Sequence, residues 1–205
     1  MKGLLKYAVL LNVLLFSTLS LHAQEAGPHM GRPAVQYGVE WGWAASVFSR
    51  IHASYYAEEG YIVDDRYSKG SFHSNGTLRG FVGCNIGKRW NITSGIAVQG
   101  LGEDTRAYVV STYASYFLGA GDFVYLGLGA GSEFEEPHEK VSLSTLGYGH
   151  RYRLTRSLAI DTKINIQGAY VHPDIYDEGS LVPESRTRKN DAFIVSIGLS
   201  LALVF

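Results

Sequence analysis

The sequence is poor in cysteine and proline, and it has no excess of charge of either sign. A single cysteine, Cys84, excludes a disulfide framework and a cysteine-based zinc site. The 18 basic and 19 acidic side chains nearly cancel, which argues against a basic nucleic-acid-binding protein. The 24 glycines and 14 tyrosines favour strands and turns over helices. The composition therefore indicates an all-β chain that does not have nucleic acid as a partner.

The N-terminus carries a targeting signal. Lys2 and Lys6 accompany a largely apolar stretch, which gives way to more polar residues and ends at the small residue Ala23. This three-part pattern is typical of a secretory signal peptide and predicts cleavage after Ala23. The apolar stretch is short for a membrane-spanning helix, which needs about 20 residues. We expect a signal peptide at 1–23 and an exported mature chain that is mildly acidic.

The C-terminal segment alternates between two kinds of residue. From Phe193 to Phe205 every second residue is large and apolar, and the residues between them are mostly small or polar. A period of two predicts a β-strand, and the same period recurs upstream along the mature chain. The strands are expected at 35–47, 78–86, 91–98, 106–118, 123–131, 140–154, 158–170 and 193–205.

The connections between these strands alternate in length. Long segments follow the first and seventh strands, at 53–72 and 171–191, whereas tight turns follow the even-numbered strands. Short turns on one side and long loops on the other are typical of transmembrane barrels. We predict an all-β, eight-stranded antiparallel up-and-down transmembrane β-barrel, with both chain ends on the short-turn side. A secreted sandwich or lipocalin-like barrel is the alternative.

The end of the chain resembles the signature that the bacterial barrel-assembly machinery reads. The last ten residues, 196–205, are SIGLSLALVF, with Phe205 at the end and Leu203 where an aromatic residue is usual. Over 35–205 the chain resembles small eight-stranded bacterial outer-membrane β-barrel proteins, and its Tyr- and Gly-rich style is similar to porin-like barrels of Bacteroides-type bacteria.

That resemblance implies a location and partners. It implies the outer membrane of a Gram-negative bacterium, a short periplasmic segment at 24–34, and a barrel domain at 35–205. The implied partners are outer-membrane lipids, lipopolysaccharide and the assembly machinery, which would recognise Leu203 and Phe205. We expect a monomer.

The inward faces of the predicted strands carry charges of both signs. These residues are Glu40, Arg79, Arg151, Arg153, Asp161 and Lys163. The interior of an eight-stranded barrel is narrow enough for side chains to fill it. Unpaired charges there would be costly, so we expect a paired structural network. A pore of small conductance is the alternative.

The predicted loops carry the candidates for binding. Exposed tyrosine is a favourable interface residue, so Tyr55, Tyr56, Tyr61 and Tyr67 are expected to contact an extracellular ligand. This gives a structural or surface-interaction role as the first hypothesis. The acidic residues of the loops are expected to form a solvated rim rather than a metal site.

A lipid A-modifying acyl hydrolase is the enzymatic alternative. His73 and Ser74 lie near the outer rim, where outer-membrane deacylases carry a His and a Ser. Adjacent strand residues point to opposite faces, and a Ser–His pair must lie within hydrogen-bond reach. We therefore expect no catalytic residues, no enzyme activity and no cofactor.

Overall fold

The computed structural model describes residues 35–70, 72–101, 106–119, 121–134, 140–155, 157–177, 179–183 and 185–205. The predicted signal peptide at 1–23 and the segment at 24–34 lie outside this range. In the described part of the chain, no helix is long and apolar enough to cross a membrane.

The described residues form strands joined by turns and loops. The strands are β1 (Val35–Tyr56), β2 (Ile62–Lys69), β3 (His73–Ile86), β4 (Trp90–Gly100), β5 (Arg106–Phe117), β6 (Asp122–Glu133), β7 (Lys140–Arg153), β8 (Ala159–Val171), β9 (Tyr176–Asp177), β10 (Ser180–Leu181) and β11 (Thr187–Val204).

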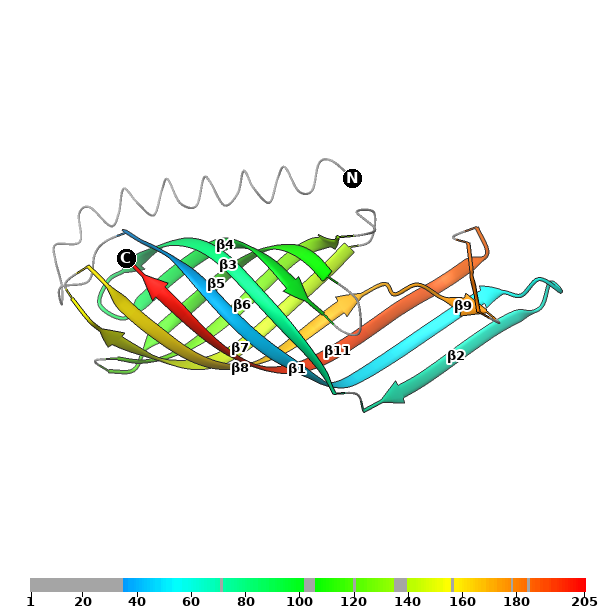
Figure 1. Cartoon of the computed structure of the whole chain (residues 1–205), viewed down its shortest axis with the longest axis horizontal. Coiled ribbons are helices and arrows are strands. Elements are labelled where there is room, and N and C mark those ends of the chain that lie inside the picture. The colour runs from blue at the N-terminus through cyan, green and yellow to red at the C-terminus, as the bar shows by residue number, and fades with distance from the viewer. Residues whose placement is uncertain are drawn as a thin grey trace.

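Eight of these strands close into an antiparallel barrel. Each pairs with its neighbour in the order β1, β3, β4, β5, β6, β7, β8, β11, and β11 pairs back with β1 from Gly38↔Val204 onward. The C-terminal ends of β3, β5 and β7 lie at the same end of the barrel as the C-terminus of the chain (Figure 1). The predicted eight-stranded antiparallel barrel and its strand order are confirmed.

The outer surface of the barrel is apolar. On β11, Leu199, Leu201 and Leu203 are each about half exposed, whereas Ala202 between them is buried. Aromatic residues lie on the same surface near the strand ends, and Tyr37 stacks on Phe205 at 5.6 Å between ring centroids. An apolar exterior around a closed sheet is the arrangement that a lipid bilayer requires, because every backbone polar group is paired within the sheet.

Two barrel strands continue beyond the barrel into a projecting sheet. β1 pairs with β2 over Ser49–Tyr56 and with β11 as far as Tyr55↔Thr187, so that β2, β1 and β11 form a three-stranded extension (Figure 1). The prediction of a loop over 53–72 is wrong, because most of this segment forms a β-hairpin. Gly60, whose φ of 87° lies in the left-handed region, sits in its turn.

A β-bulge marks the transition from barrel to extension. The register between β1 and β11 shifts between Ser46 and Phe48, so that Val47 and Phe48 are both exposed. A bulge reverses the alternation of faces beyond it. Consequently the odd-numbered residues of β1 face lipid before the bulge, and they face the mouth of the barrel beyond it.

Candidate functional site

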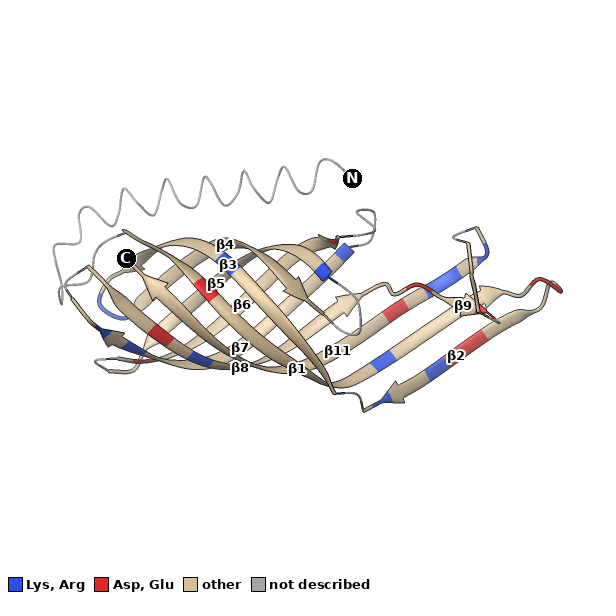
Figure 2. Ribbon diagram, viewed as in Figure 1, with Lys and Arg blue, Asp and Glu red and all other residues tan. Residues whose placement is uncertain are grey.

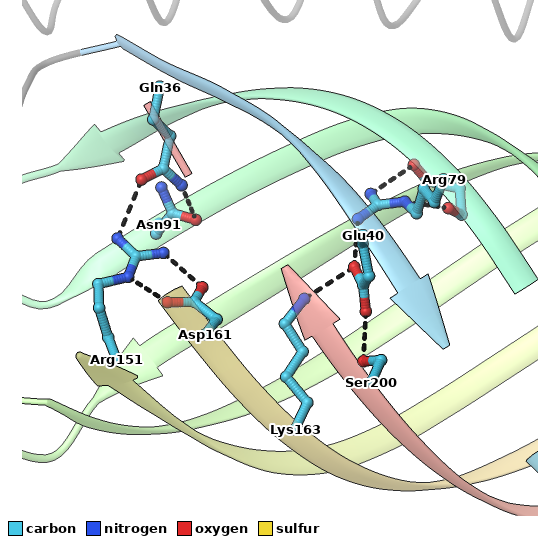
Figure 3. A network of polar contacts seen from close by, with 9 residues as sticks. Gln36, Glu40, Arg79, Asn91, Arg151, Asp161, Lys163 and Ser200 are labelled. Carbon is cyan, nitrogen blue, oxygen red and sulfur yellow. Dashed lines mark hydrogen bonds and ion pairs between the residues drawn. The ribbon is translucent and has the colours of Figure 1, made fainter. Parts of the chain in front are cut away.

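The half of the lumen nearest the C-terminus contains a buried ionic cluster centred on Glu40. Its carboxylate accepts hydrogen bonds from Lys163 Nζ at 2.8 Å, from Ser200 Oγ at 2.6 Å and from Arg79 Nη1 at 3.4 Å. These side chains come from β1, β8, β11 and β3 and converge in the interior (Figure 3). Glu40, Lys163 and Arg79 are each less than 10% exposed. One carboxylate thus joins two cationic groups across the barrel.

A second ion pair lies beside this cluster. Arg151 on β7 forms a two-pronged pair with Asp161 on β8, at 2.6 and 2.7 Å. Arg151 also donates to Gln36 Oε1 at 3.0 Å, and Gln36 donates to Asn91 Oδ1 at 2.9 Å (Figure 3). The paired geometry and the amide chain satisfy these polar groups away from bulk water.

Aromatic rings complete the packing around the cations. The Arg79 guanidinium lies 4.0 Å from the centroid of the Tyr113 ring, and Lys163 Nζ lies 5.6 Å from that of Tyr125. The faces of these rings partly compensate the excess of positive charge in the cluster. A pocket among these side chains has a volume of about 10 Å³, which is room for about one water molecule.

The other half of the lumen contains a cluster of buried apolar side chains. This apolar plug consists of Leu101, Ala107, Val109, Val141, Leu143, Ala169, Val171 and Ala192. Sequence reasoning missed it because it assigned the inward faces to small and polar residues. In the segment 106–118, whose two faces the sequence could not distinguish, Ala107 and Val109 face inward and Tyr108 faces outward.

The predicted lumen residues fall into two groups. Glu40, Arg79, Asp161, Lys163 and the Arg151 side chain are buried in the network. The placement of Arg153 in the lumen is wrong, because it lies at the exposed end of β7. The alternation of β7 continues to Arg153, but the packed interior does not extend that far.

A cavity of about 450 Å³ opens at the outer mouth of the barrel. One wall is the projecting sheet, and the opposite wall runs from the connection after β8 into β9 and includes Pro173, Ile175 and Tyr176. Val171 and Ala192 belong both to the lining and to the apolar plug, so the plug is the floor of this mouth cavity. Its volume lies in the range of small-molecule sites.

The predicted contact tyrosines are distributed over both faces of the projecting sheet. Tyr56, Tyr61 and Tyr67 are 41–60% exposed. Tyr67 lines the mouth cavity. On the Tyr56 side chain, the Arg188 guanidinium carbon lies 5.7 Å from the centroid of the ring.

Tyr55 is an exception, because it is 7% exposed and packs with Ile175 and Val182. Its hydroxyl donates to Asp177 Oδ1 at 3.1 Å. The prediction of Tyr55 as an exposed contact is therefore wrong, and this residue instead anchors the β9–β10 segment to the projecting sheet.

His73 and Ser74 point to opposite sides of β3. His73 lines the mouth cavity, and Ser74 Oγ accepts a hydrogen bond from Trp43 Nε1 at 2.5 Å. Within the described ranges, no cluster of His, Cys, Asp or Glu could hold a metal ion. The acidic residues at 135–139 lie outside the described residues.

The face of the projecting sheet opposite the cavity carries its own charge cluster. His52 lies 2.8 Å from Asp64 Oδ1, and Arg66 Nε lies 3.5 Å from the same oxygen. The hydrogen bond with His52 makes the largest contribution, followed by that with Arg66, and both lower the pKa of the Asp64 carboxyl group below its usual value. Charged residues are frequent on this extension and sparse along the barrel strands (Figure 2).

Comparison with known proteins finds similarity only among solved structures. No protein-family model and no curated protein matches the chain. A designed transmembrane β-barrel has 9% identity and a TM-score of 0.39, over 85% of this chain and 98% of the designed one. Ail, the attachment invasion locus protein of Yersinia pestis, has 14% identity and a TM-score of 0.38, over 84% of this chain and 100% of Ail.

Outer-membrane expressed OmpT of Vibrio cholerae has 11% identity and a TM-score of 0.25, over 80% of this chain and 52% of OmpT. All of these identities are low, so the fold assignment depends on the strand pairing of the chain itself. By that pairing, the chain is a closed eight-stranded antiparallel β-barrel with an apolar outer face.

Proposed function

We propose that this chain is an outer-membrane β-barrel protein that binds ligands at the cell surface through its projecting sheet. The observation that carries the proposal is the contrast between the two ends of the molecule. The lumen is filled by an ionic cluster and an apolar plug, whereas β1, β2 and β11 extend beyond the barrel and expose Tyr61 and Tyr67. Barrels of this kind occur in the outer membrane of Gram-negative bacteria. Here the barrel acts as an anchor for the extension.

Contacts with lipid belong to this proposal. The outward face of the extension meets the apolar belt at a recess of about 200 Å³, lined by Arg50, His52, Arg66, Tyr170, Asp191 and Phe193. Arginine matches the geometry of phosphate groups, so Arg50 and Arg66 are suited to the headgroups of lipopolysaccharide. The proposal also includes three earlier expectations. These are assembly through Leu203 and Phe205, a monomeric state, and kinship with Bacteroides-type porin-like barrels.

The adhesive role is tested by shortening the hairpin. Removing 52–66 and joining Ile51 to Tyr67 through an Asn-Gly turn uses an existing register pair and retains every β1–β3 pair. We expect the shortened barrel to insert normally, as judged by its heat-dependent gel mobility. Adherence of bacteria that display it, to surfaces coated with polypeptides or with polysaccharides, should fall to the level of cells lacking the chain.

A pair of matched double variants controls for loss of tyrosine as such. Tyr61→Ser with Tyr67→Ser should lower adherence, whereas Tyr37→Ser with Tyr152→Ser, on exposed residues near the opposite end of the barrel, should not. Undiminished adherence of the shortened protein would contradict the proposal. Failure of that protein to insert would show that the hairpin belongs to the fold rather than to the binding surface.

Conduction is the competing function, and the filled lumen argues against it. Purified protein in planar bilayers is expected to give no stable conductance steps, because charged and apolar side chains occupy the lumen at two successive levels. Reproducible single-channel openings that disappear when the protein is omitted would make a pore the better assignment. A hydrolase is disfavoured because His73 and Ser74 face opposite sides of their strand.

A further inference from the structure

We propose that the mouth cavity binds a short apolar peptide with free ends, its ammonium group at Asp65 and Asp174 and its carboxylate at Lys69. The inference deepens the proposed surface-binding role, on which it rests, by naming a ligand class. It depends on the pattern in which β2, β1 and β11 present side chains to the cavity.

The strand register arranges the cavity-facing residues of the sheet in three rows. The outer row contains Asp65, Ala53 and Asn190, in which Ala53 of β1 pairs with Asp65 on one side and with Asn190 on the other. The middle row contains Tyr67, Ile51 and Ala192, and the inner row contains Lys69, Ser49 and Ile194. All nine residues line the cavity. From the outside inward, β2 thus presents an anion, an aromatic ring and a cation on one face.

The opposite wall reinforces this polarity. Asp174, in the segment that leads into β9, and Tyr176, the first residue of β9, face the cavity, and Ile175 between them packs on Tyr55. Because Tyr55 lies in the outer part of β1, this places the Asp174 segment near the outer row. His73, which pairs with Ser46, lines the inner end together with Lys69. The cavity therefore has an anionic outer end and a cationic inner end.

The spacing of the charges selects the length of the ligand. Asp65 and Lys69 are four residues apart on one strand, which corresponds to roughly 13 Å between their Cα atoms. An extended tripeptide with free ends spans about 10 Å at the usual rise of roughly 3.3 Å per residue. Its ends can therefore approach the two charges while its central side chain lies against Tyr67, Ile51 and Ala192.

The chemistry of the middle row favours an apolar central side chain. Ala192 is only 2% exposed, and Ile51 packs against the apolar plug. An apolar group placed here would lose water-exposed surface, which is favourable in proportion to the area buried. Tyr67, half exposed at the rim, can cover it.

The test uses one peptide in three forms. Alanyl-leucyl-alanine with free ends, its N-acetyl form and its C-amide form are titrated against the full barrel in lipid nanodiscs, with saturation-transfer difference NMR as the readout. Acetylation removes the cation and amidation removes the anion, while the apolar side chain is unchanged. We expect each modification to weaken binding by roughly three- to tenfold, as for partly exposed ion pairs.

Charge variants assign each end of the peptide to its partner. Asp65→Asn combined with Asp174→Asn should abolish the discrimination between free and acetylated peptide, and Lys69→Gln should abolish that between free and amidated peptide. Asp64→Asn and Arg66→Gln are the matched controls, because these neighbours on β2 lie in the cluster on the opposite face. They should leave both discriminations unchanged.

The outcomes separate the inference from the role on which it rests. Equal binding of the three peptides, or no saturable binding, would overturn the peptide site. Loss of adherence in the shortened hairpin would still support the surface role in that case. The proposed orientation would also be overturned if the double variant Asp65→Asn/Asp174→Asn still discriminates free from acetylated peptide, or if Lys69→Gln still discriminates free from amidated peptide.

Discussion

Replacing Glu40 by alanine is expected to destabilise the folded barrel by about 3–5 kcal/mol, because it leaves Arg79 and Lys163 buried without their shared carboxylate. The two cations are 2% and 9% exposed, so water cannot replace the lost partner without rearrangement of the lumen. The measurement is reversible urea unfolding in lipid vesicles, with the midpoint and the slope fitted together.

Two milder substitutions distinguish charge from packing in this cluster. Glu40→Gln retains the shape of the side chain and loses its charge, and it should retain much of the destabilisation. Ser200→Ala removes one neutral donor to the charged Glu40 carboxylate and should cost about 1.5–3 kcal/mol. If Glu40→Gln unfolds at the wild-type urea concentration while Glu40→Ala unfolds at a lower one, the packing of the Glu40 side chain rather than its charge stabilises this part of the lumen.

The barrel could be predicted from the sequence because its strands have a strict period of two. On β8, Asp161 and Lys163 alternate with apolar residues, and the structure buries both charged side chains in the lumen. The identity of their partners could not be predicted. Lys163 meets Glu40 across 123 residues of sequence, and such a contact is fixed by the register of the closed sheet, which local alternation does not reveal.

The alternation of residues in the sequence did not predict the projecting sheet, for two physical reasons. The bulge near Val47 interrupts the alternation of β1, so the strand signal ends there although the strand continues to Tyr56. β2 is exposed along nearly its whole length, and a strand without a buried face has no apolar period to detect. Gly60 was the available signal, since a glycine between two stretches of strand-forming residues is compatible with a hairpin.

The sequence did not predict the mouth cavity either, because residues from distant segments line it. Its walls come from β1, β2, β11 and the stretch that leads into and begins β9, which contributes Asp174 and Tyr176. Their approach to Tyr67 depends on Tyr55, whose burial against Ile175 and Val182 holds the two walls together. Composition indicated tyrosines available for binding but not that one of them serves as this anchor.

An arginine at Leu146 is expected to destabilise the inserted barrel by about 2–4 kcal/mol, whereas an arginine at Tyr152 should cost only about 0–1 kcal/mol. Both residues point outward from β7, and they are 62% and 52% exposed. Leu146 pairs with the exposed Leu126 and Ile166 near the middle of the strand, and Tyr152 lies one residue from its end. The free-energy cost of placing a charge in the bilayer increases with its depth, so arginine at these two positions distinguishes a residue near the midplane from a residue near the membrane interface. Urea unfolding of both variants in vesicles measures the difference. Equal stabilities would mean that this apolar face does not lie in a bilayer, and a water-exposed barrel would then be the better description.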